Sequence, residues 1–262
     1  MIHDIKDIIA KQPTQHSLNW YRVRLGKFTG SQVGRLMKRG KGGEYFSKDA
    51  MSYITEVVAE RMLNPSVVYV DELFEEYLLQ ATATSKAMAW GSDQEMNARG
   101  LYASLRKCKV TSCGAVEVEG TWFASSPDGV LLDEDGVIEI KCPTNTTHTA
   151  YMRNVHDAES LKAVKPEYYW QCMAHMMVTG AKFCDWMSYC PFSKKPLHVV
   201  RIDRDDDALI ELREHITAAE REAMRVGKVA REKRRSEGNL SPEEEELLLN
   251  ESRFAKAEYK RN

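Results

Sequence analysis

Two carboxylates and a lysine stand close together in one segment of the chain. Asp128 belongs to a Ser-Pro-Asp-Gly sequence, and Glu139 and Lys141 flank Ile140 a short distance further on. Because alternate residues of a strand point to the same face, Glu139 and Lys141 should project together, with Ile138 and Ile140 facing a core. Asp128 should begin the adjoining strand of a hairpin. We therefore expect the three polar side chains to converge on one point.

This set of side chains is suited to phosphodiester hydrolysis. Carboxylates and the backbone carbonyl of Ile140 are hard oxygen ligands for Mg²⁺ or Mn²⁺. Such a metal polarises a phosphoryl oxygen and lowers the pKa of a bound water, and Lys141 can orient that water and offset the developing charge. The alternative is an exposed hairpin with a surface ion pair. Ser-Pro before Asp128 and Cys-Pro after Lys141 make the pattern more specific for a metal-dependent nuclease.

A second candidate feature is a basic run near the N-terminus. The chain has a formal net charge of only −2, so any basic surface must be local. No acid occurs from Trp20 to Gly43, and this stretch holds seven basic residues: Arg22, Arg24, Lys27, Arg35, Lys38, Arg39 and Lys41. The run indicates an anion site, with a solvated surface stretch as the alternative.

Hydrophobic spacing and turn residues predict the elements that position these groups. We expect helices over 48–64, 86–106, 166–180 and 205–235, with another beginning at Ser241-Pro242-Glu243. Short antiparallel strands joined by tight turns should fill 115–141, and further strands 183–202. Residues 40–43 (GKGG) should form a flexible loop. This order predicts an α/β or α+β core with a helical tail.

The remaining composition is that of an ordinary globular protein. No apolar run of eighteen residues occurs, so we expect no membrane span. The N-terminus lacks the apolar region of a signal peptide, so we expect no such peptide there. Six cysteines are present without a Cys-x-x-Cys pair or a defensible metal-ligand spacing. We expect them to be reduced and mostly buried in a cytoplasmic compartment.

Four ordered segments carry a family resemblance. SSPDGVLLDEDGVIEIKCP resembles the phage lambda exonuclease and YqaJ-type viral recombinase family of the PD-(D/E)xK nuclease superfamily. Residues 20–31 (WYRVRLGKFTGS) resemble its N-terminal signature. Ala89-Trp90-Gly91 followed by Glu95 resembles its acidic helix, and Tyr168-Tyr-Trp-Gln171 resembles its tyrosine–glutamine helix. Together the segments span residues 20 to about 200.

The resemblance implies a restriction-endonuclease-like α/β core with a mixed central sheet flanked by helices. From the expected elements we assign this core to residues 1–204, and we assign 205–262, which lies beyond the resemblance, to a helical extension of the same domain. The resemblance also implies residue roles. Asp128 and Glu139 would bind two Mg²⁺ ions, which Mn²⁺ could replace, and Glu95 would complete the shell. Lys141 would position the water, and Gln171 would hold that water or the metal shell.

The same resemblance implies a DNA end site and a partner. Arg24 and Ser31 would bind a 5′ phosphate, with Tyr168 and Trp20 beside the DNA, although packing is the alternative role for Trp20. The activity implied is processive 5′→3′ digestion of double-stranded DNA from free ends, giving mononucleotides and a 3′ tail. A homotrimeric ring, a single-strand annealing recombinase as partner and a phage or prophage origin in a bacterial host are implied too.

Two details and three alternatives remain open. Met173 stands where many relatives have a second glutamine, and this difference affects the fine positioning of groups in the site. His175 lies one helical turn beyond Gln171 and could face the site. The alternatives are a structure- or site-specific endonuclease on the same core, a non-catalytic DNA-binding scaffold, and a nuclease acting on RNA. Cutting of closed circular DNA would indicate the endonuclease, and failure to digest any DNA would indicate the scaffold. Digestion of RNA would indicate the RNA nuclease.

Overall fold

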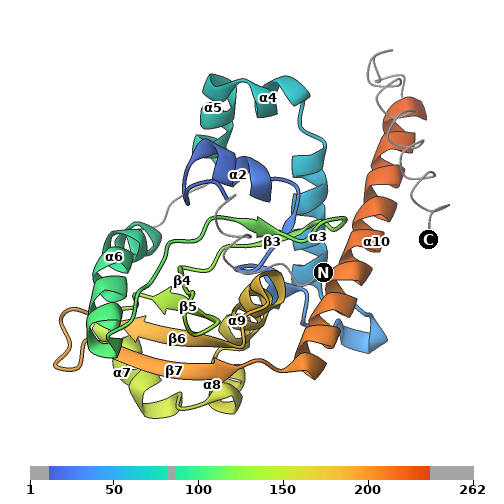
Figure 1. Ribbon diagram of the computed structural model, residues 1–262. Helices are drawn as coiled ribbons and strands as arrows, with labels where there is room; N and C mark the ends of the chain where they lie inside the picture. Colours follow the sequence, from blue (N-terminus) through green and yellow to red (C-terminus); the bar gives the residue numbers. More distant parts are fainter. Residues whose placement is uncertain (1–11, 82–85, 237–262) are drawn as a thin grey trace.

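A mixed four-stranded sheet forms the centre of the molecule (Figure 1). The computed structural model describes residues 12–81 and 86–236. The sheet has the order β4-β5-β6-β7, formed by Gly129–Leu131, Gly136–Lys141, Phe183–Tyr189 and Leu197–Asp203. β5 and β6 are parallel, and the two outer pairs are antiparallel. A parallel pair needs a long crossover. Here it consists of helices α7 (Asn145–Asn154), α8 (Ala158–Val164) and α9 (Pro166–Thr179).

Helices cover both faces of this sheet, which explains its apolar strands. Val137, Cys184 and Trp186 belong to the core on the side of α9 and the long helix α10 (Asp206–Ser236). Ile138 and Ile140 belong to a second core on the side of α6 (Lys86–Arg106). The expected alternation along β5 is therefore confirmed. It leaves Glu139 and Lys141 on the α9 side of the sheet.

A smaller sheet connects the N-terminal part of the chain to the centre. Its order is β1-β3-β2, formed by Phe28–Thr29, Phe123–Ser125 and Val116–Glu117. β2 and β3 form the expected antiparallel hairpin, whereas β1 pairs with β3 in parallel. The prediction of one antiparallel set over 115–141 was therefore incomplete, because these strands divide between two sheets. Pro127, which lacks a backbone N–H for a ladder, lies between β3 and β4.

The predicted helices appear close to their expected ends. α3 (Lys48–Arg61), α6, α9 and α10 match four of them. Pro166 opens α9 and Gly180 ends it in the left-handed conformation, with φ of 72°. Residues 40–43, expected to be a flexible loop, include a 3₁₀ turn, η2 (Lys41–Gly43). The helix expected at Ser241 lies outside the described residues.

Several short helices were not anticipated from the sequence. They are α2 (Leu18–Arg24), α4 (Pro65–Tyr69), α5 (Asp71–Ala81), α7, α8 and the 3₁₀ turn η1 (Val33–Arg35). The long helix α10 lies beside α3 and α9 (Figure 1), and Leu212, Ile216 and Ala219 join the main core. The described helices include no segment with the length and apolar character of a membrane span.

Candidate active site

Glu139 lies at the centre of a buried polar cluster. Its side chain is buried, and each carboxylate oxygen has one partner. Lys141 Nζ lies 2.6 Å from Oε1, and His175 Nε2 lies 2.7 Å from Oε2. The other ring nitrogen, His175 Nδ1, lies 2.8 Å from Ser125 Oγ on β3. Strand β5 and helix α9 thus meet at the Glu139 carboxylate, and His175 links this contact to strand β3.

Lys141 connects this cluster to a polar face of α9. Its Nζ donates to Gln171 Oε1 at 3.0 Å and lies 4.6 Å from the centre of the Tyr168 ring. Tyr168, Gln171 and His175 follow one another at helical spacing, so they share one side of α9. The structure therefore brings together Glu139, Lys141, Gln171 and Tyr168, as the family resemblance implied.

The charges of Glu139 and Lys141 stabilise one another. Burial opposes ionisation of Glu139, but the Lys141 ammonium and the hydrogen bond from His175 outweigh it and lower the pKa of Glu139. Burial likewise opposes the charge on Lys141, and the carboxylates of Glu139 and Asp128 outweigh it and raise the pKa of Lys141. The pair is therefore ionised at neutral pH.

Asp128 joins the cluster through the backbone of β5. Its Oδ2 accepts a hydrogen bond of 2.7 Å from the Ile140 N–H, and its own N–H donates to Ile138 O at 3.1 Å. Burial, then the negative charges of Glu139 and Glu95, raise the pKa of Asp128 well above its ordinary value. The three acids thus lie close enough together for the charges of Glu139 and Glu95 to oppose ionisation of Asp128.

Glu95 approaches from helix α6, on the far side of the pocket from α9. It pairs with Arg99 one turn later, and Arg99 also donates to Ser112 Oγ at 2.9 Å. Glu95 and Asp128 line one pocket of about 280 Å³, together with Gln171 and His175. The acidic helix therefore reaches the site, as its motif predicted.

The donor set fits a divalent cation. Asp128, Glu139, Glu95 and the Ile140 carbonyl are hard oxygen donors of the kind Mg²⁺ prefers. Burial is the main cause of the raised pKa of Asp128, and the neighbouring charges of Glu139 and Glu95 add to it; a cation would offset those charges. Among the described residues, no group of three acidic, histidine or cysteine side chains is already arranged to hold a metal. In the described arrangement both Glu139 oxygens contact Lys141 and His175 instead.

The other end of the same pocket carries Arg24. Its Nη1 donates to Ser126 Oγ at 3.4 Å, and its guanidinium carbon lies 4.3 Å from the centre of the Trp20 ring. Trp20 Nε1 also donates to Ser126 Oγ, at 3.0 Å. Burial lowers the pKa of Arg24, and the guanidinium forms no ion pair with a described carboxylate. Ser31 lines the pocket as well, so Arg24 and Ser31 are brought together as expected.

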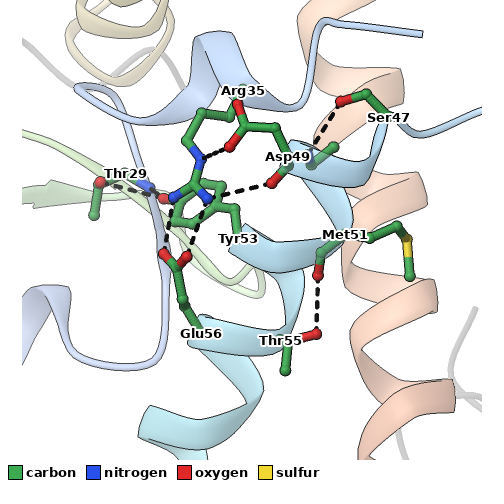
Figure 2. Close-up of polar contacts among 9 residues, drawn as sticks. Thr29, Arg35, Ser47, Asp49, Met51, Tyr53, Thr55 and Glu56 are labelled. Carbon is green, nitrogen blue, oxygen red and sulfur yellow. Dashed lines mark hydrogen bonds and ion pairs between the residues drawn. The ribbon is translucent and has the colours of Figure 1, made fainter. Parts of the chain in front are cut away.

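Most of the basic run does not share this site. Arg35 is held by Asp49 and Glu56 and packs over Tyr53 (Figure 2). Arg22 pairs with Asp71, and Lys27 pairs with Glu117. Acids that are distant in the sequence thus neutralise three cations of the run. Among the seven basic residues of the run, Arg24 lines the pocket.

His175, expected from the sequence only as a residue that could face the site, contacts Glu139 directly, and Ser125 was not anticipated. The helical spacing from Gln171 to His175 was the available signal for the histidine. Ser125 gave no signal of its own, because its contact with His175 joins residues 50 positions apart. The expectation of mostly buried cysteines is confirmed: Cys113, Cys172, Cys184 and Cys190 are buried, and none of the six is paired in a disulfide.

Comparison with solved structures identifies close architectural relatives. An alkaline exonuclease, LHK-Exo from Laribacter hongkongensis, superposes with a TM-score of 0.67 and 27% sequence identity, covering 84% of this chain and 99% of that one. The complex of LHK-Exo with dAMP gives the same TM-score at 26% identity, covering 86% and 100%. A phage-related exonuclease from Haemophilus somnus shares the fold, with a TM-score of 0.59 at 15% identity, covering 79% and 96%.

The sequence itself also matches a described family. No curated protein matches the chain. The YqaJ-like viral recombinase domain matches residues 19–182, which include the Arg24 pocket, the Asp128 to Lys141 segment and the polar face of α9. The restriction-endonuclease-like fold of the exonuclease neighbours agrees with this match. The chain therefore belongs to the YqaJ-like viral recombinase family.

Proposed function

We propose that this protein is a metal-dependent exonuclease that digests one strand of double-stranded DNA from its 5′ end. Nuclease activity is supported by the family and by the LHK-Exo similarity. One observation carries the finer proposal: acids of the hydrolytic centre line the same small pocket as Arg24, a cation that pairs with no described carboxylate. An anion held by Arg24 would therefore lie beside the catalytic groups.

The acids and the lysine divide the chemistry between them. Asp128, Glu139 and Glu95, with the Ile140 carbonyl, would hold Mg²⁺, with Mn²⁺ as a substitute. When bound, the metal ions polarise the phosphoryl oxygen and lower the pKa of a water molecule. Lys141 keeps its positive charge next to the reacting phosphate and stabilises the negative charge that develops there. Gln171 fixes the Lys141 ammonium from α9.

Substitution tests this division directly. Asp128→Ala, Glu139→Ala and Lys141→Ala should each abolish digestion of linear duplex in Mg²⁺, because each loss commonly costs several kcal/mol of barrier. Lys38→Ala, an exposed cation of the basic run, is the matched control and should digest normally. Near-normal turnover by any of the three site variants would refute the site.

The polarity proposal depends on the chemistry of a terminal phosphate. A 5′-terminal phosphate carries more charge and more free oxygens than a bridging diester, and a guanidinium can grip it with two hydrogen bonds. Arg24 is already stacked on Trp20 and bonded to Ser126, so little side-chain freedom is lost on binding. Binding at this phosphate would align the next diester with the acids.

Two substrates and one variant test the polarity. Duplex with a 5′ phosphate should be digested about tenfold or more faster than duplex with a 5′ hydroxyl, since a charge-assisted contact contributes roughly 1.5–3 kcal/mol. Arg24→Ala should remove most of this preference, and Lys38→Ala should retain it. If Arg24→Ala slows both substrates equally at one fixed salt concentration, Arg24 is a backbone clamp and not an end sensor. An end-labelled duplex also reports product size and the surviving strand.

The proposed function also includes processive digestion by an oligomer and transfer of the product strand to a partner protein. A homotrimeric ring around the DNA would explain processive digestion, because a closed ring cannot easily leave its substrate. The 3′ tail would then pass to a single-strand annealing recombinase. The dAMP complex of LHK-Exo supports mononucleotides as products. Light scattering tests the ring: a monomer mass at micromolar concentration with processive digestion retained would exclude it. Cutting of closed circular DNA would favour an endonuclease.

A further inference from the structure

An exposed aromatic side chain stands on the loop between β6 and β7. Phe192 is 77% exposed, and its ring stacks on Trp90 of α6 with 5.7 Å between centroids and 18° between planes. The stack holds Phe192 in one orientation and leaves its outer face to solvent. Single exposed apolar residues are common on protein surfaces. A ring held flat against a second ring has, in addition, the geometry of a stacking platform.

The loop that carries Phe192 is fixed by its own hydrogen bonds. Cys190 N donates to Pro196 O at 2.8 Å, and Ser193 N donates to Cys190 O at 3.1 Å. His148 Nε2 lies 2.8 Å from the Lys195 carbonyl oxygen and ties the loop to α7. A ring on such a loop loses little freedom when a ligand stacks on it, so binding there is preorganised.

Two cations accompany the ring. Lys194 and Lys195 follow Phe192 closely, both are exposed, and neither forms an ion pair with a carboxylate of the described part of the chain. Sequence-tolerant binding of single strands combines aromatic rings, on which bases stack, with cations along the phosphate backbone. The loop therefore offers both parts of a single-strand site.

The loop lies at the same edge of the sheet as the hydrolytic centre. Lys141 ends β5 and pairs in register with Ser188 on the parallel strand β6, and the loop begins two residues later at Cys190. On α6, Trp90 precedes Glu95 by five residues, which corresponds to roughly 7.5 Å along the helix. A strand that passes Glu95 can therefore reach the stack by moving this distance along α6 and about 140° around it.

We propose that Phe192, stacked on Trp90 and flanked by Lys194 and Lys195, is a binding platform for unpaired bases of single-stranded DNA beside the active site. The identity of the nucleic acid rests on the proposed function. An unpaired base stacks on the outer face of Phe192, and the lysines contact the adjacent phosphates. The platform thus holds a single strand that lies next to the hydrolytic pocket.

Binding of a fluorescent single-stranded oligothymidylate tests the platform. Fluorescence anisotropy is measured in EDTA, so that no strand is digested. Phe192→Ala should weaken binding about 5- to 150-fold, the loss expected for one stacked base. Phe192→Tyr should restore binding. Tyr69→Ala, an equally exposed aromatic on the distant helix α4, is the matched control and should bind normally (Figure 1).

Two further arms separate stacking from charge. An oligonucleotide of the same length without bases should bind wild type and Phe192→Ala equally. Lys194→Ala combined with Lys195→Ala should reduce the slope of log affinity against log salt by about 1.4, since each single-strand phosphate contact contributes about 0.7. Equal binding of oligothymidylate by wild type and Phe192→Ala overturns the platform. A protein that digests no DNA but shows the Phe192 effect retains the platform and loses the proposed function.

Discussion

Replacing His175 by leucine tests the arrangement around Glu139. His175 is fully surrounded by protein, with Nε2 at 2.7 Å from Glu139 and Nδ1 at 2.8 Å from Ser125. Leucine has a similar bulk but no polar atom, so both contacts are lost. A hydrogen bond to a charged group contributes about 1.5–3 kcal/mol, and one between neutral groups about 0.5–1.5 kcal/mol. Together they predict a loss of roughly 2–4.5 kcal/mol of unfolding free energy.

That loss has two measurable consequences. For a chain of this size each kcal/mol lowers Tm by about 2–4 °C, so the metal-free His175→Leu variant should melt roughly 5–15 °C below wild type. The Glu139 carboxylate also loses a partner that holds it in place. If the interaction is needed in the transition state, single-turnover cleavage in saturating Mg²⁺ should slow about 10- to 150-fold, the rate equivalent of 1.5–3 kcal/mol.

A conservative replacement distinguishes positioning from general packing. The amide introduced by His175→Gln would keep one donor for Glu139, so this variant should recover a large part of the cleavage rate. Ser125→Ala removes only the outer hydrogen bond and should cost less than His175→Leu in both assays. If His175→Leu melts and cleaves like wild type, or if His175→Gln is no better than His175→Leu, His175 does not position Glu139.

Three further predictions follow from the same geometry. Folding raises the pKa of Asp128, so this group stabilises the fold below its unfolded pKa and loses that contribution as pH rises through its folded pKa. Asp128→Asn should therefore raise the Tm of the metal-free protein at pH 8 but not at pH 4. Equal changes in Tm at both pH values would refute this. The hydrogen bond from His175 helps to lower the pKa of Glu139, so His175→Leu should raise that pKa. Wild type loses the stabilising contribution of the Glu139 carboxylate as pH falls through this pKa, and His175→Leu should lose it at a higher pH. Acid titration of the unfolding free energy of both proteins measures the difference. A Cβ on Gly30 would lie 2.0 Å from Ser125 Oγ, so Gly30→Ala should destabilise the fold by about 1–3 kcal/mol in denaturant titration, whereas Gly91→Ala, with open space around its Cβ, should not.

The regular geometry of strands and helices allowed part of the site to be predicted from the sequence. Strand alternation put Glu139 and Lys141 on one side of β5, and helical spacing put Tyr168 and Gln171 on one side of α9. Pro166 and Gly180 marked the ends of that helix because each residue has a restricted or unusual backbone preference. These features depend on residues a few positions apart, so the sequence alone determines them.

Tertiary packing decided which of these local faces meet. The parallel pairing of β5 with β6 depends on a crossover of three helices, and the contact of His175 with Ser125 depends on where α9 lies against β3. The sequence indicated one anion site along the basic run, but in the folded chain Asp49, Asp71, Glu56 and Glu117 pair with three of its seven cations. Coulombic attraction and hydrogen bonding act over a few ångströms in space, whatever the separation in sequence. The family resemblance had already singled out Arg24, but only the packed chain shows that Arg22, Lys27 and Arg35 are paired elsewhere and that His175 contacts Glu139.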